Sequence, residues 1–343
     1  MVEQKFCCDI FSHSESYIFI DVRSPSEFAC GHIPGAHNIP LFSDDIRALV
    51  GTCYVQQGRG SAIHLAMQKI GPNLNQLVVQ AQQVINNKIL CVYCARGGMR
   101  SASVSWLFAL FKLPVVQLSG GYKAFRNWTL AQFETKQMLQ VLGGKTGSGK
   151  TEYLKYLAQT GDQVIDLEKL ARHKGSVFGG DKRNQATQQQ FENDLALIWI
   201  QLDTKSSVWI EDESRKIGSV IIPEPVWLLM RQAPVYVLLS KRTERVARIM
   251  CEYGSLDRDF VLQALAEIKD HLGFELYQSI YRAYQDKNYL FAVDTLLMYY
   301  DKKYAHGFLH KKCAGCFAFF PELPKKSIFK RSILALSSLF LFG

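Results

Sequence analysis

Two loops in this chain of 343 residues carry the residue types that anion chemistry needs. Cys94–Ser101 reads Cys-Ala-Arg-Gly-Gly-Met-Arg-Ser, and Gly144–Thr151 reads Gly-Lys-Thr-Gly-Ser-Gly-Lys-Thr. The first loop offers a thiol beside two arginines, and the second is a glycine-rich loop that ends on lysine and threonine. Together they predict that a nucleophilic cysteine and a phosphate-binding loop serve one reaction.

The cysteine loop is predicted to connect a strand to a helix. The apolar run Ile89–Tyr93 predicts a buried strand, and Ser101–Phe111 predicts a helix. Cys94 then lies where backbone N–H groups and the helix dipole favour an anion, and Arg96 and Arg100 add full charges. Such a setting lowers a thiol pKa and makes thiolate available near neutral pH. We therefore predict these three residues to be catalytic; the alternative is a half-buried free cysteine beside two solvated arginines.

The second loop fits the pattern G-x-x-x-x-G-K-[ST] between a predicted strand at Val141–Leu142 and a predicted helix from Glu152. Lys150 is expected to reach the terminal oxygens of a diphosphate, and Thr151 to bind Mg²⁺. A P-loop recognises a phosphate chain, and what the chain is attached to is decided elsewhere. The predicted phosphate-binding residues are Gly144, Gly147, Ser148, Gly149, Lys150 and Thr151.

A second metal ligand is predicted at the end of a later strand. The apolar run Ser207–Ile210 is followed by Glu211, Asp212 and Glu213, which is the arrangement of a Walker B element. Asp212, or Glu211 beside it, is expected to hold Mg²⁺ through water, together with Thr151. The alternative is a solvated acidic turn at a strand end.

Segments around the cysteine loop resemble the rhodanese domain. The apolar run Ile18–Val22 precedes Arg-Ser-Pro-Ser-Glu-Phe, and Gly31–Pro40 reads Gly-His-Ile-Pro-Gly-Ala-His-Asn-Ile-Pro. A Gly-Gly-Tyr turn at 120–122 follows the apolar run Val115–Leu118. The resemblance covers residues of about 15 to 130. It implies an α/β domain whose cysteine carries sulfur or selenium as a persulfide or perselenide.

The order of the two loops and of three further segments resembles that of the tRNA 2-selenouridine synthase family. These segments are Gly51–Gly58, Asp166–Gly179 and Glu211–Gly218. The resemblance runs from about residue 21 to 304. It implies a two-step reaction at the wobble uridine of tRNA. Geranyl diphosphate alkylates the 2-thio group, and selenium from selenophosphate then displaces the S-geranyl group. No tightly bound cofactor is expected; Mg²⁺ is a candidate ligand on the strength of the P-loop threonine and the acidic strand end. We expect the P-loop to bind the diphosphate and the cysteine loop to handle selenophosphate.

Two other functions remain alternatives. One is a rhodanese-type sulfurtransferase fused to a nucleotide-dependent kinase or ATPase, which would release phosphate without a geranyl donor. The other is a non-catalytic tRNA-binding adaptor, which would bind tRNA equally well after Cys94→Ser. The intact cysteine loop and P-loop argue against the adaptor.

Additional candidate residues have competing interpretations. Cys53 is a second redox or relay thiol, or a small buried side chain. Arg172 and His173 contact tRNA phosphate or the donor, or belong to a solvated turn. Arg215 serves as a further cation beside the acidic strand end, or neutralises the carboxylates there.

Composition bounds the remaining expectations. A formal charge of +9 favours a polyanionic partner, here tRNA. Nine cysteines without a signal peptide indicate reduced thiols and a cytoplasmic protein. No run reaches the roughly 20 apolar residues of a membrane span. A monomer is expected.

The predicted fold class is α/β, with a rhodanese-like domain at 1–130 followed by a P-loop NTPase-like α/β domain at 131–304 that has a helical C-terminal portion. A helix over Asn127–Leu139 is expected between them, and Leu256–Met298 shows helical periodicity. Residues 305–343 form an atypical tail with a Cys-x-x-Cys pair, Cys313 and Cys316. A frameshifted end and a lineage-specific tail are the two interpretations of this departure from the family.

Overall fold

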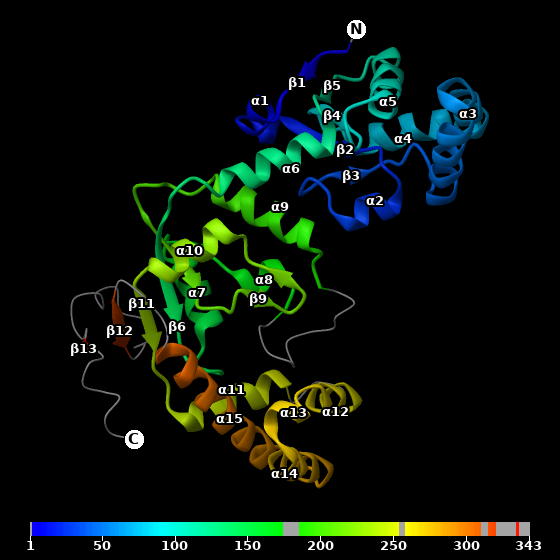
Figure 1. The fold of residues 1–343 in the computed structure, drawn as a ribbon. Helices are drawn as coiled ribbons and strands as arrows, with labels where there is room; N and C mark the ends of the chain where they lie inside the picture. Colours follow the sequence, from blue (N-terminus) through cyan, green and yellow to red (C-terminus); the bar gives the residue numbers. More distant parts are fainter. Residues whose placement is uncertain (1, 174–184, 254–257, 310–314, 320–333, 336–343) are drawn as a thin grey trace. The chain divides into compact units, whose positions relative to one another are not determined.

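The structure, a computed structural model, describes residues 2–173, 185–253, 258–309, 315–319 and 334–335 (Figure 1). The chain divides into two compact units, each built around its own sheet. Unit 1 comprises residues 1–132 and 187–200, and unit 2 comprises residues 133–186 and 201–343. Both units combine parallel strands with helices, as the predicted fold class requires.

The sheet of unit 1 has five parallel strands in the order β1-β5-β4-β2-β3. Its strands are β1 (Gln4–Lys5), β2 (Tyr17–Asp21), β3 (His37–Asn38), β4 (Ile89–Tyr93) and β5 (Val115–Leu118). Its helices are α1 (Cys7–Phe11), α2 (Pro25–Cys30), α3 (Asp44–Ile70), α4 (Leu74–Val84), α5 (Met99–Leu110), α6 (Gly121–Gln132) and α9 (Gln188–Trp199), with short 3₁₀ turns at Ser14–Ser16 and Gly71–Asn73.

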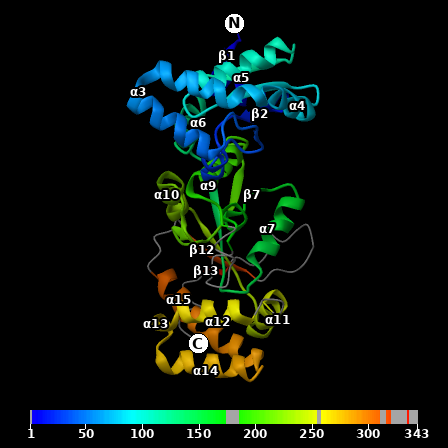
Figure 2. The ribbon, with the colours of Figure 1, turned by 90° about the vertical axis from the view of Figure 1, so that its right-hand side faces the viewer.

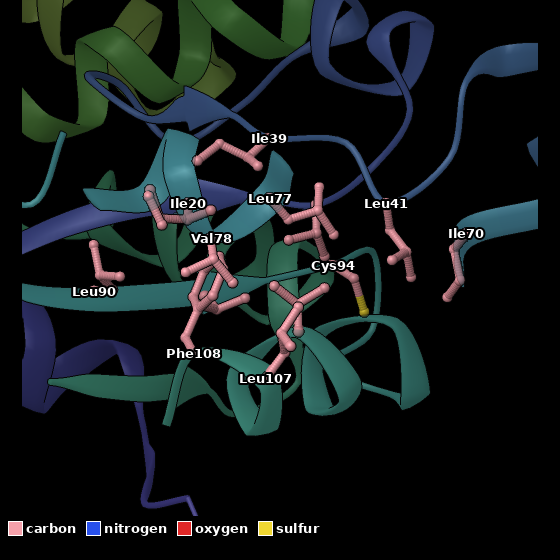
Figure 3. Packing of buried hydrophobic residues seen from close by; sticks show 14 of the residues in the cluster. Ile20, Ile39, Leu41, Ile70, Leu77, Val78, Leu90, Cys94, Leu107 and Phe108 are labelled. Atoms are coloured by element: carbon pink, nitrogen blue, oxygen red, sulfur yellow. The ribbon is translucent and has the colours of Figure 1, made fainter. Parts of the chain in front are cut away.

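Side chains that alternate along the central strand β4 enter two different cores. Leu90, Val92 and Cys94 face a cluster formed with α4 and α5 (Figure 3), whereas Cys91 and Tyr93 face a cluster formed with α1 and α6. This alternation is the period of two that an extended strand imposes. Since both faces are covered, the strands are apolar throughout, as is usual in parallel sheets.

Helix α9 belongs to unit 1, although it follows strands of unit 2 in the sequence. It lies alongside α6 (Figure 1), and Asn193 Nδ2 donates to Tyr122 Oη at 2.9 Å. Arg126 Nη1 donates to Asn193 Oδ1 at 2.6 Å, and the N–H of His32 donates to Gln190 Oε1 at 3.0 Å. Sequence order had placed this segment inside the second predicted domain. Its polar contacts with α6 and the α2–β3 turn join it to the first.

The sheet of unit 2 has the order β13-β12-β11-β6-β8-β7, parallel except for the β12–β13 pair. Its strands are β6 (Met138–Gly143), β7 (Gln163–Ile165), β8 (Ser207–Glu211), β11 (Val235–Leu238), β12 (Cys316–Phe319) and β13 (Leu334–Ala335), and β9 (Lys216–Ile217) pairs separately with β10 (Val220–Ile221). Its helices are α7 (Lys150–Gln159), α8 (Leu167–Ala171), α10 (Glu224–Gln232), α11 (Arg242–Tyr253), α12 (Arg258–Glu267), α13 (Lys269–Leu272), α14 (Phe274–Gln285) and α15 (Tyr289–Leu309).

The expected helix over Asn127–Leu139 is wrong in its second half. Helix α6 ends at Gln132, and strand β6 begins at Met138. Leu139 and Val141 are buried, and β6 pairs with β8 and β11. Tertiary pairing of this apolar segment therefore overrides its local helix propensity.

The helical portion predicted over Leu256–Met298 is confirmed by α12 to α15, which gather with α11 at one end of unit 2 (Figure 2). Tyr277 and Tyr281 pack against a buried cluster that includes Leu265 and Ile280. Among the described helices, none has the length and apolar character that crossing a membrane requires.

Candidate functional site

The cysteine loop begins where β4 ends. Cys94 Sγ lies 3.2 Å from Ser101 Oγ in the first turns of α5. Gln117 of β5 donates from Nε2 to Ser101 Oγ at 2.9 Å and to Gly97 O at 2.8 Å. The buried Gln117 amide therefore occupies one lone pair of the Ser101 oxygen and holds this hydroxyl beside the sulfur.

The surroundings of Cys94 favour its thiolate. Burial opposes ionisation, since the side chain is 3% exposed. This effect of burial is outweighed by hydrogen bonds to the sulfur and by the charge of Arg100. The hydrogen bonds come from the Ser101 hydroxyl and from the backbone N–H groups of Arg96 and Ser101. The pKa of Cys94 is therefore lowered from 9.0. A buried thiol with such a pKa is suited to nucleophilic chemistry.

The two arginines of the loop have different surroundings. Arg100 donates to both carboxylate oxygens of Glu27 in α2, at 2.6 and 3.2 Å, and Arg47 Nε lies 3.6 Å from the same carboxylate. Burial opposes ionisation of Glu27, but the hydrogen bond and charge of Arg100 hold its pKa below the usual value. Arg96 is exposed. Arg100 is thus tied to α2, and Arg96 is the loop arginine with its side chain directed to solvent.

A glycine turn closes the cysteine loop from the other side. The N–H of Tyr122 donates to Cys94 O at 2.9 Å. Gly97 has a φ of +65°, and a Cβ there would come within 2.8 Å of Gly120 N. Glycine is needed at this position because both the conformation and the close approach exclude a side chain.

The P-loop connects β6 to α7, as predicted. Gly147 and Gly149 have φ values of +75° and +92°, which glycine adopts readily. Lys150 begins α7, and its Nζ lies 3.4 Å from Gly144 O. The structure thus brings together the six predicted phosphate-binding residues in one strand–loop–helix turn, at the N-terminus of a helix that favours anions.

Two carboxylates meet at Thr151. Its Oγ1 lies 3.4 Å from Glu211 Oε1 and 3.4 Å from Glu168 Oε2, and the N–H of Glu168 donates to Glu211 Oε2 at 3.3 Å. Glu211 is the last residue of β8, beside β6, and is fully buried. The pKa of Glu211 is raised to about 8, mainly by burial. The negative charges of Glu168, Asp166 and Glu213 raise it further.

This arrangement places Glu211, rather than Asp212, at the P-loop threonine. The N–H of Asp212 donates to Leu142 O at 2.9 Å, and its side chain is half-buried. Hydroxyl and carboxylate oxygens are ligands that suit Mg²⁺, so Thr151 and Glu211 fit this ion. Bound there, it would supply positive charge to a diphosphate. Among the described residues, no three or more His, Cys, Asp or Glu side chains form a metal site by themselves.

Two protein-family models match this chain, and each covers one of the two loops. Residues 137–319 match the family model described as the tRNA 2-selenouridine synthase AAA domain, and residues 11–127 match that of the rhodanese-like domain. A tRNA 2-selenouridine synthase of Hydrogenovibrio crunogenus is 35% identical over 328 residues, which cover 86% of this chain and 90% of that protein. One of Salmonella typhi is 34% identical over 338 residues, with the same coverage of 86% and 90%.

The chain belongs to the tRNA 2-selenouridine synthase family. A relative of that name from Shewanella denitrificans is 39% identical over 243 residues, covering 68% of this chain and 65% of that protein. The predicted family resemblance and the predicted fold class, a rhodanese-like domain followed by a P-loop domain, are both confirmed.

The family match extends into the segment predicted as an atypical tail. It continues to residue 319, beyond Tyr304, and includes β12, which pairs in parallel with β11. Helix α15 likewise runs on to Leu309. Cys313 of the Cys-x-x-Cys pair lies outside the described residues.

The additional candidates lie in different parts of this family member. Cys53 is on α3, partly exposed, with its Sγ 3.7 Å from Gln57 Oε1. Arg172 is exposed and ends α8 in a left-handed conformation, with a φ of +52°. The N–H of His173 donates to Glu168 O at 3.0 Å. Arg215 Nη2 lies 3.6 Å from Glu224 Oε2 of α10.

Several residues at these loops were not singled out from the sequence. Ser101 could have been identified as the residue that closes the Cys-x₅-Arg-Ser segment. Glu168 is the last residue of the Asp-Leu-Glu segment that directly follows β7. Other residues carry no local signature, because only the folded chain brings them to the loops. They are Gln117 and Glu27 at the cysteine loop, and Arg245 and Arg248 of α11, which donate to backbone oxygens of the P-loop.

Proposed function

We propose that this protein is a tRNA 2-selenouridine synthase that replaces the sulfur of wobble 2-thiouridine with selenium through an S-geranyl intermediate. The observation that carries the proposal is the presence, in one member of this family, of a buried thiol with a lowered pKa and a complete P-loop. The tRNA substrate is taken from the name of the relatives, and the formal charge of +9 is consistent with it.

The first step is alkylation at sulfur. The 2-thio sulfur forms a bond to C1 of the geranyl group, the C1–O bond breaks, and its electron pair leaves with the diphosphate. Lys150 and the P-loop N–H groups stabilise the charge on the departing group. Thr151 and Glu211 would hold Mg²⁺ at the same phosphate chain.

The second step is displacement at C2 of the uridine. A selenium nucleophile derived from selenophosphate bonds to this carbon, and the C–S electrons leave with geranyl thiolate. The exposed Arg96 would bind the phosphoryl oxygens of selenophosphate through its guanidinium. The Cys94 thiolate, held by Ser101, is the nucleophile available to the donor: its sulfur bonds to phosphorus, the P–Se bond breaks with its electron pair on selenium, and water then cleaves the S–P bond to return the thiolate and phosphate.

Nucleoside mass spectrometry tests both steps. Thiolated tRNA is incubated with Mg²⁺ and geranyl diphosphate, with or without selenophosphate, and pre-geranylated tRNA with selenophosphate alone. Lys150→Ala should lose geranylation but still selenate pre-geranylated tRNA, while Cys94→Ala should stop at the geranylated nucleoside. Lys155→Ala and Cys251→Ser, both exposed, are matched controls that should form both products.

Other outcomes would support different functions. Phosphate release from nucleotide without any geranyl product from folded wild-type protein would favour a sulfurtransferase fused to a kinase or ATPase. Unchanged tRNA affinity in Cys94→Ser, with no modified nucleoside from wild type, would favour an adaptor. Loss of selenation of pre-geranylated tRNA in Lys150→Ala would refute the division of labour between the loops.

A further inference from the structure

Two arginines of α11 hold the backbone of the P-loop. Arg245 Nε donates to Thr146 O at 2.9 Å, and Arg248 Nη1 donates to Gly147 O at 2.6 Å. A peptide C=O and the N–H of the following residue lie in one plane and point in opposite directions. A guanidinium on Thr146 O therefore sets the direction of the Gly147 N–H, one of the donors that a P-loop presents to phosphate.

Arg245 is itself held by a carboxylate from α15. Its Nη1 and Nη2 lie 2.9 and 2.6 Å from the two oxygens of Asp301, and Lys145 Nζ of the P-loop lies 3.6 Å from the same carboxylate. The Arg245 side chain is 3% exposed. A buried guanidinium without its carboxylate would be strongly unfavourable, so this pair acts as one unit.

We propose that Arg245 and Asp301 are positioning residues for the P-loop: the pair fixes the Lys145–Gly147 turn against α15 and so sets the affinity for a diphosphate. Neither residue is placed on the ligand, and both act through the loop backbone. The pair acts on the loop that holds the diphosphate, whether a geranyl group or a nucleoside is attached to that diphosphate.

A second ion pair between the same helices provides a matched control. Arg242 Nε lies 2.6 Å from Asp294 Oδ1, and Arg242 Nη2 donates to Asp294 O at 3.1 Å. This pair also joins α11 to α15, but its described hydrogen bonds do not involve the P-loop. Loss of helix packing alone would affect both pairs, whereas loss of loop positioning affects only the first.

The experiment is titration calorimetry of the full chain with inorganic diphosphate in the presence of Mg²⁺. Asp301→Asn and Arg245→Lys should weaken binding by about tenfold or more, since each disrupts charge-assisted hydrogen bonds. Asp294→Asn and Arg242→Lys should stay within about twofold of wild type. Asp301→Glu, which keeps the carboxylate, should bind more tightly than Asp301→Asn.

Thermal unfolding of each variant, without ligand, separates positioning from folding. If Asp301→Asn does not fold, Arg245→Lys and Asp301→Glu, which keep both charges, decide the question. Wild-type affinity in folded Asp301→Asn and Arg245→Lys would overturn the proposal, as would an equal loss in Asp294→Asn. If wild type binds diphosphate but geranylates no tRNA, the proposed function fails and the positioning role stands.

Discussion

At the scale of single residues, Cys94 is buried, but a polar contact offsets the effect of burial on its pKa. The same side chain belongs to an apolar cluster with Leu107 and Phe108 (Figure 3). Its sulfur also lies 3.2 Å from the Ser101 hydroxyl. Burial alone raises a thiol pKa, as it does for Cys7, whose pKa is raised to about 11. The Ser101 hydroxyl, the loop N–H groups and Arg100 thus account for a lowered thiol pKa at Cys94, where Cys7 of the same unit has a raised one.

Replacing Ser101 with alanine should make Cys94 less reactive near neutral pH. The folded-state pKa of Cys94 is lowered partly by the Ser101 hydroxyl, so its removal should move the pKa upward. The check is the rate of alkylation by iodoacetamide as a function of pH, with Cys94 read by peptide mass spectrometry. Ser103→Ala is the control, because that exposed hydroxyl donates to Arg100 O instead. An unchanged midpoint in Ser101→Ala would contradict the assignment.

Glu211 should make stability depend on pH. Its pKa in the folded protein, about 8, lies above the ordinary value of 4.5, so the folded state keeps a proton that the unfolded chain loses. The stabilisation that this proton gives to the folded state is fully present below a pH of about 4.5, and it is lost as the pH rises through about 8. The free energy of unfolding should therefore fall by up to about 1.4 kcal/mol per pH unit within that window.

Glu211→Gln removes this titration, so its stability should fall less steeply with pH than that of wild type. Urea unfolding at several pH values, with a chelator present to exclude divalent cations, measures the difference. Glu224→Gln changes an exposed carboxylate and should retain the wild-type slope. Equal slopes for wild type and Glu211→Gln would show that this carboxyl ionises normally.

At the scale of secondary-structure elements, the sequence predicts the two loops well because each follows an apolar strand and contains glycines at constrained positions. The strands Ile89–Tyr93 and Ser207–Glu211 follow from apolar runs alone. Element ends are less predictable, since Met138 begins a strand only through pairing with β8. The Arg245–Asp301 pair has no local pattern, because 56 positions separate its members.

Strand β12 should contribute to the stability of unit 2. It pairs with β11 from Val235↔Cys316 to Leu238↔Phe319, and without it β11 would become the edge of the sheet. Because the lost ladder hydrogen bonds each contribute about 1 kcal/mol, a chain ending at Leu309 should be less stable by a few kcal/mol. The exposed edge should also favour aggregation.

Thermal unfolding and light scattering of the shortened chain measure both effects. A chain ending at Ala335 retains β12 and its pairing with β13, and serves as the control. If the chain ending at Leu309 matched this control in stability and solubility, β12 would not be needed for the fold of unit 2.

At the scale of the whole molecule, the polypeptide passes between the two units three times, after residues 132, 186 and 200. Helix α9 is contributed to unit 1 by a segment that follows Glu168, the carboxylate beside Thr151. A division of the chain at a single point therefore removes an element from the rhodanese-like unit. Sequence order alone gives no sign of this, since α9 has the composition of an ordinary helix of the P-loop unit.

Residues 1–132 expressed alone should accordingly be less stable than residues 1–132 joined to 187–200 by a flexible glycine-serine linker. Without α9, Tyr122 Oη loses the hydrogen bond from Asn193, Arg126 loses its partners, and Leu197 no longer covers the adjoining apolar cluster. Since each lost hydrogen bond or buried side chain contributes about 1–3 kcal/mol, the deficit should amount to several kcal/mol.

Urea unfolding of the two fragments tests this expectation, and Asn193→Ala in the linked fragment separates polar contacts from helix packing. Asn193 is fully buried and also donates to His32 O at 2.8 Å, so its replacement removes hydrogen bonds to His32, Tyr122 and Arg126 while α9 stays in place. An intermediate stability is expected for this variant. Equal stability of residues 1–132 with and without α9 would mean that the rhodanese-like unit folds independently of the inserted helix.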